Sequence, residues 1–101
     1  MSNHYAGILY LCDRPNTPGT ILYKNVKRNI KYITESEVLK EVSLSGEFDD
    51  IKFWEPTVVS YIQFNRLIIY PTNRFHGIGP VFGDSVENSR LVQLFFWQEI
   101  K

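Results

Sequence analysis

The chain has 101 residues, enough for one domain, and its hydrophobic content of 44% is sufficient for a packed core. Basic and acidic residues number 11 each, so the net charge is zero and the basic excess typical of a nucleic-acid-binding protein is absent. Cys12 is the single cysteine, which excludes an intrachain disulfide, and no apolar run approaches the roughly 18 residues of a membrane span. The first residues also lack the basic region of a signal peptide. These properties predict a cytoplasmic protein without a nucleic-acid or membrane partner.

The first part of the chain predicts two strands joined by a loop. Residues 5–11, YAGILYL, form an apolar run of strand length, and alternation places Ala6, Ile8 and Tyr10 on one face. The following CDRPNTPG is dense in turn-forming residues and predicts a loop. A second short strand is predicted over residues 20–23.

A helical segment is predicted over residues 34–43. Thr34 and Glu37 have the spacing of a capping box, and the apolar residues that follow have helical spacing. Gly46 and the acidic residues after it are expected to end the helix. The preceding segment, KNVKRNIK at residues 24–31, contains four basic residues and is interpreted as a solvated loop rather than a phosphate site.

The second half predicts four more strands, over residues 58–64, 66–70, 80–82 and 90–97. Many short strands with one helix indicate an antiparallel sandwich or barrel. The pattern alone does not choose between a jelly roll, an immunoglobulin-like fold and an open barrel.

Residues 65–97 carry an ordered set of motifs. An apolar strand is followed by a histidine and a glycine, a Pro-Val pair, a turn with glycine, and an arginine that leads a strand ending in an aromatic residue. The residues concerned are His76, Gly77, Pro80, Val81, Gly83, Arg90 and Trp97. This order resembles the C-terminal half of the 2-oxoglutarate and Fe(II)-dependent dioxygenases, the prolyl-hydroxylase-like group in particular. Residues 5–25 are similar to that family's strand ending in Tyr-Leu, its variable loop, and a Gly-Thr that starts the next strand.

The resemblance implies a double-stranded β-helix of the jelly-roll or cupin type, and an oxidoreductase that uses Fe(II) and 2-oxoglutarate. It assigns His76 as an iron ligand, Arg90 as the partner of the 2-oxoglutarate C5 carboxylate, and Tyr10 as an auxiliary hydroxyl. Arginine suits a carboxylate because its guanidinium can donate two parallel hydrogen bonds. Arg90 would also share an inward face with Val92 and Leu94, where an unpaired charge is unfavourable.

One departure from the family pattern is large. The family's triad of two histidines and one carboxylate begins with His-x-Asp, and no such motif is present. His4 is the only other histidine, and Ala6 follows it where an aspartate is required. His4-x-Ala6 matches the related halogenases, but it lies too close to Tyr10. We therefore expect residues 1–101 to be a single partial domain, incomplete at its N-terminus and inactive alone because two of three metal ligands are missing.

Alternative interpretations remain open. The chain is a fragment of a dioxygenase, or it is a non-catalytic remnant that serves as a small binding or structural β-domain. His76 and Arg90 are then ordinary surface residues, and Tyr10 is a core residue. In either case, the missing strands predict an unpaired edge near residues 5–11 and self-association through it, because exposed edges promote association. The substrate, a small molecule or a peptide, is not indicated.

Overall fold

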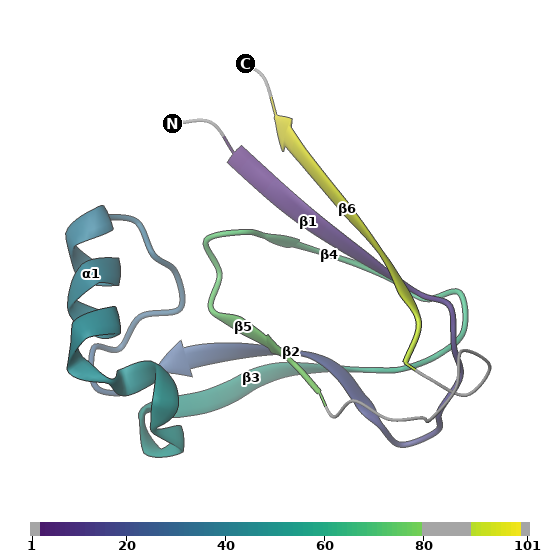
Figure 1. Ribbon diagram of the computed structural model, residues 1–101, viewed down its shortest axis with the longest axis horizontal. Helices are drawn as coiled ribbons and strands as arrows, with labels where there is room; N and C mark the ends of the chain where they lie inside the picture. Colours follow the sequence, from purple (N-terminus) through teal and green to yellow (C-terminus); the bar gives the residue numbers. More distant parts are fainter. Residues whose placement is uncertain (1–2, 80–89, 100–101) are drawn as a thin grey trace.

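The computed structural model describes residues 3–79 and 90–99 as two three-stranded antiparallel sheets and one α-helix (Figure 1). The strands are β1 (Asn3–Tyr10), β2 (Pro18–Asn25), β3 (Trp54–Tyr61), β4 (Leu67–Pro71), β5 (His76–Ile78) and β6 (Val92–Glu99). The helix α1 (Ser36–Ser45) leads into two short 3-10 helices, η1 (Glu47–Asp49) and η2 (Ile51–Phe53). The predicted mainly β class is confirmed, and the two sheets do not close into a barrel. Within the described ranges, no helix is long and apolar enough to cross a membrane.

The strand order is β4-β1-β6 in one sheet and β3-β2-β5 in the other. In Figure 1 the sheets approach each other at the end where β1 passes to β2, and they diverge toward α1. The expectation of an unpaired edge near residues 5–11 is wrong, because β1 is a central strand that pairs with β4 on one side and β6 on the other. The edges of the sheets, over the residues described, are β4 and β6 in the first and β3 and β5 in the second.

The core lies between the two sheets. Ala6, Ile8 and Tyr10 of β1 are buried and form a cluster with Ile62 and Tyr70. The shared face predicted for these three residues is therefore confirmed, and it is the buried face of β1. Full burial of an aliphatic side chain such as Ile8 contributes about 1.5–3 kcal/mol, so this face is a main reason why β1 lies where it does.

Strands β3 and β5 differ from the prediction. β3 begins four residues before the expected Val58 and runs through Pro56, which is tolerated because β3 is an edge strand and the pairing shifts register between Leu22 and Tyr23. The chain leaves β3 after Tyr61 rather than continuing as a strand to residue 64. Strand β5 is not predicted by the sequence pattern, and the strand expected over residues 80–82 lies outside the described residues.

The helix is confirmed, but its start is shifted. It begins at Ser36 rather than Thr34, its N-cap is Glu35, and no side chain caps it, so the predicted capping box does not form. Its end agrees with the prediction: Gly46 has a left-handed backbone with φ of 79°, a conformation that glycine adopts without steric penalty.

Candidate functional site

Two buried hydroxyls join the sheets at the end where they come together. The Tyr10 hydroxyl lies 2.8 Å from Oγ1 of Thr20, the third residue of β2. The Tyr10 ring covers the backbone of Gly19, where a Cβ atom would overlap the phenol oxygen. The Gly19-Thr20 pair therefore positions the Tyr10 hydroxyl, because only glycine allows this close approach.

Arg90, just before β6, reaches the same point on β2. Its Nη2 donates a hydrogen bond of 2.8 Å to the carbonyl oxygen of Gly19. Its Nε is buried and has no hydrogen-bond partner in the part of the chain that the structure describes. A buried donor without a partner costs about 1–3 kcal/mol. The guanidinium thus has unused bonding capacity beside two hydroxyl groups, an arrangement that suits a carboxylate ligand.

His76, the first residue of β5, is exposed, and its ring contacts the opposite sheet. It pairs with Leu22 of β2, and directly paired residues of antiparallel strands point to the same face. Leu22 packs against the core cluster, and the His76 ring lies 4.8 Å from the ring of Tyr70 in the opposite sheet, centroid to centroid. Leu22 is two residues from Thr20, so the His76 position is about 7 Å along the strand from the hydroxyl pair.

The hydrogen bonds of the histidine determine its tautomer. Nδ1 of His76 lies 2.7 Å from the carbonyl oxygen of Arg74, which can only accept, so Nδ1 carries the proton. In the neutral form of the ring, the lone pair is then on Nε2. A backbone carbonyl that fixes the tautomer in this way is common around histidines that bind metals.

The tyrosine beside the histidine is a neutral donor. Burial, and then the nearby Tyr10, raises the pKa of Tyr70 above its usual range. Its hydroxyl therefore stays protonated at neutral pH.

A complete metal centre is not present among the described residues. These residues contain no group of three or more histidine, cysteine, aspartate and glutamate side chains that could hold a metal ion. His76 is a single imidazole, whereas a facial triad requires two further ligands. The described residues therefore do not form an Fe(II) site by themselves.

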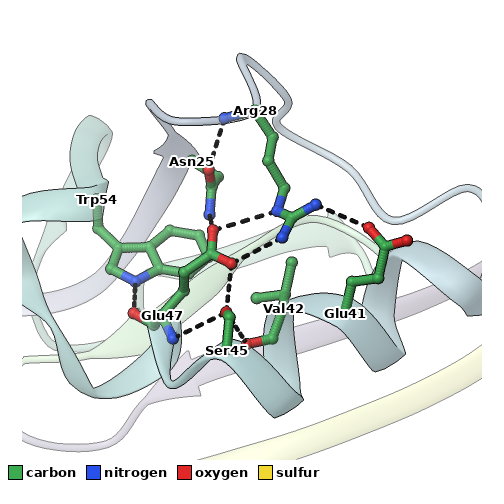
Figure 2. A network of polar contacts seen from close by, with 7 residues as sticks. All are labelled: Asn25, Arg28, Glu41, Val42, Ser45, Glu47 and Trp54. Atoms are coloured by element: carbon green, nitrogen blue, oxygen red, sulfur yellow. Dashed lines mark hydrogen bonds and ion pairs between the residues drawn. The ribbon is translucent and has the colours of Figure 1, made fainter.

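A second polar cluster, at the far end of β2, is fully bonded (Figure 2). The buried carboxylate of Glu47 accepts hydrogen bonds from Nη2 of Arg28 at 2.8 Å, from Nδ2 of Asn25 at 3.1 Å and from the Ser45 hydroxyl. The Arg28 guanidinium, with the Ser45 hydroxyl and the Asn25 amide, lowers the pKa of Glu47 to about 2 against the effect of burial. Arg28 also pairs with Glu41 of α1 at 3.0 Å. This network fastens α1 and η1 to β2.

The sequence pattern reveals only part of both clusters. Residues 24–31 are expected to be a solvated loop, but Arg28 is half-buried. It forms an ion pair with Glu47, which lies 19 residues later in the sequence. Thr20 is a site residue that the sequence-based interpretation missed, although the Gly19-Thr20 pair at the start of a predicted strand was a usable signal. Of the three expected site residues, Tyr10 and Arg90 meet at this pair, and His76 faces the same interior from β5.

Comparison with known proteins gives no match to this chain. No protein-family model matches it, and no match was found among curated proteins or solved structures. A function must therefore be inferred from the geometry around Arg90, Tyr10 and His76.

Proposed function

We propose that this chain is the C-terminal part of a double-stranded β-helix domain of the 2-oxoglutarate and Fe(II)-dependent dioxygenase type, and that it binds the 2-oxoglutarate carboxylate. One observation carries the proposal: the half-buried Arg90 has a buried Nε without a partner among the described residues, beside the paired hydroxyls of Tyr10 and Thr20. Arginine and hydroxyl donors in a buried position are suited to one end of a dicarboxylate. His76 faces the same interior at a distance compatible with the other end.

The sheet topology supports the fold part of the proposal. A jelly roll consists of two antiparallel sheets that face each other. Here β6 is an edge strand of the described chain, and its inward residues Leu94 and Phe96 are 54% and 71% exposed. Strand β5 is the corresponding edge of the other sheet. We infer that further strands of the domain pair with these two edges.

The same edges provide a route to self-association. Unpaired strand edges with apolar side chains pair readily with another chain. We expect the 101-residue chain to associate through β6, and sedimentation velocity at increasing concentration measures this. A monomer at all concentrations would contradict it.

The iron part of the proposal requires ligands from outside the described residues. One imidazole cannot hold Fe(II) tightly, because affinity comes from several ligands fixed together. We therefore propose that this chain binds 2-oxoglutarate without oxidising a substrate, and that a strand beside β5 supplies the two missing ligands. A cytoplasmic location is part of the same proposal.

A second candidate function is a non-catalytic binding domain in the same fold. The observation that favours it is that the described residues contain no metal-binding group. In this case the anion site at Arg90 is retained, and His76 has no metal to bind.

The experiment that tests the anion site is calorimetric titration of the metal-free chain with 2-oxoglutarate. The Arg90→Gln variant should bind about 10- to 100-fold more weakly, because a hydrogen bond to a charged group contributes roughly 1.5–3 kcal/mol. Arg66→Gln is the matched control, since Arg66 bonds to Tyr61 and Gln63 on the surface. Equal affinity for the wild type and Arg90→Gln, or no binding to either, would overturn the proposal.

The coding DNA upstream of Met1 separates the two candidates. An in-frame His-x-Asp would favour the dioxygenase, and a stop codon would favour the non-catalytic domain. In a longer protein with that motif, His76→Ala should abolish iron binding, whereas Arg90→Gln should keep the iron and raise the 2-oxoglutarate requirement. Metal analysis and succinate production measure both effects.

A further inference from the structure

Four aromatic rings gather on the outer face of the β3-β2-β5 sheet. Trp54 of β3 is their centre: its ring centroid lies 4.8 Å from that of Phe75, 5.6 Å from Phe48 and 6.5 Å from Tyr23. Tyr23 follows the inward Leu22, so it points away from the interior that contains the hydroxyl pair. This aromatic cluster is therefore separate from the site at Arg90.

The aromatic cluster surrounds an open cavity. The cavity has a volume of about 360 Å³, and Asp49, Ile51, His76 and Gly77 complete its lining. This volume lies in the range of small-molecule pockets. Phe48 is 49% exposed at its rim, so the rings are not fully covered by protein. The Trp54 indole donates a hydrogen bond of 2.7 Å to the backbone carbonyl of Glu47, which fixes the orientation of the central ring.

The charges around the cavity favour a cationic ligand. Asp49 is the only carboxylate among the lining residues, and no lysine or arginine of the described chain lines the cavity. Two lysines near the lining residues in sequence are engaged elsewhere: Lys27 and Lys52 lie over the Phe53 ring, at 5.7 and 5.2 Å from its centroid. Aromatic faces attract cations through their quadrupole, and a carboxylate at the rim adds to the attraction.

We propose that this cavity binds a trimethylammonium group, carried by a small molecule or by a methylated lysine side chain. Methyl groups remove the hydrogens that hold water on an ammonium and add apolar surface, so the desolvation on entering an aromatic pocket is small. An unmethylated ammonium would have to give up the water bound to its N–H groups. A guanidinium would need several hydrogen-bond acceptors for its five N–H groups, and the lining has a single carboxylate. This site does not use Arg90, Tyr10 or Thr20, and it shares one lining residue, His76, with the proposed function.

The test uses Trp54 as a reporter. The other tryptophan, Trp97, stacks on Tyr5 in the opposite sheet, so a Trp97→Phe background isolates the Trp54 signal. Choline is titrated against its neutral tert-butyl analogue, with fluorescence as the readout. Choline should bind, and the neutral analogue should bind about 2- to 30-fold more weakly, the range expected of cation–π attraction. If the Trp97→Phe protein does not fold, ring-current shifts of the choline methyl protons with the wild-type chain give the same comparison.

Variants of the lining provide the second arm. Asp49→Asn and Phe48→Leu should each weaken choline binding, whereas Glu55→Gln and Phe64→Leu should not, because Glu55 and Phe64 are exposed and do not line the cavity. A peptide with trimethyllysine distinguishes the sources: tighter binding than choline indicates a protein side chain, and weaker binding indicates a small molecule. Equal binding of the neutral analogue, no effect of either lining variant, or no binding of choline and peptide would overturn the proposal.

Discussion

A charged side chain packs against each end of β2, the buried Glu47 at one end and the half-buried Arg90 at the other, but only Glu47 is fully bonded. Near Asn25, the Glu47 carboxylate and the Arg28 guanidinium satisfy each other, with Ser45 and Asn25 completing the set. Near Gly19, Arg90 makes one bond to a backbone carbonyl and leaves its Nε without a partner among the described residues. Native proteins rarely leave a buried donor unsatisfied, so the exception requires an explanation. This difference marks a structural junction at one end of β2, and it supports the proposed ligand-binding position at the other.

The largest expected effect on stability comes from breaking the ion pair between Arg28 and Glu47. Arg28→Met leaves the Glu47 carboxylate buried without its counter-charge, which is strongly destabilising for such a pair. The urea midpoint of this variant should fall further than that of Glu47→Gln or Arg90→Met. Arg66→Met, which removes a surface arginine, is the control. An equal fall in the urea midpoint of Arg28→Met and Arg66→Met would show that the network is not a structural junction.

An intermediate effect on stability is expected from protonation of Glu47 at low pH. The folded state holds the pKa of Glu47 at about 2, below its ordinary value of 4.5. The unfolded chain therefore takes up the proton first, and the contribution of Glu47 to stability is present above pH 4.5 and is lost as the pH falls toward 2. Glu47→Gln should remove this part of the pH dependence. Urea unfolding of both proteins over this pH window measures it, and parallel curves would contradict the assignment.

The smallest effect on stability is expected at Arg90, which contacts the Gly19 end of β2. Arg90→Met removes the hydrogen bond to the Gly19 carbonyl, which still accepts from the Gly79 N–H, and it also removes a buried donor that has no partner among the described residues. The free energy of unfolding should therefore change by less than about 1 kcal/mol, or increase. The same variant should lose affinity for 2-oxoglutarate. Urea unfolding beside Arg28→Met tests the contrast, because a comparable loss of stability in both would mean that the two ends of β2 have the same structural role.

Parts of this arrangement are predictable because they depend on local patterns. Alternation along residues 5–11 predicts that Ala6, Ile8 and Tyr10 share a face, which is buried in the structure. The apolar stripe with Gly46 predicts the helix and its end. Tyr10 and Arg90 are expected at one site by resemblance, and they do meet at Gly19-Thr20.

Other parts depend on contacts that no local pattern reveals. The three residues of β5 are too few to show alternation, so the sequence around His76 predicts a turn rather than a strand. Pro56 suggests a strand boundary, but an edge strand accepts it. The Arg28–Glu47 pair joins a turn to the residue after a helix, and no local feature distinguishes Glu47 from the other acidic residues as the partner of Arg28.

The pairing of β1 with β6 has a consequence for how this chain reaches its structure during synthesis. Of the described strands, β1 leaves the ribosome first and β6 last, yet they lie side by side over their whole length, from Asn3 opposite Glu99 to Tyr10 opposite Val92. Contacts between residues so far apart in sequence form slowly, because a long loop must close first. The growing chain must therefore keep one side of β1 unpaired until its last strand has emerged, and this interval is when a chaperone or another nascent chain has access to it.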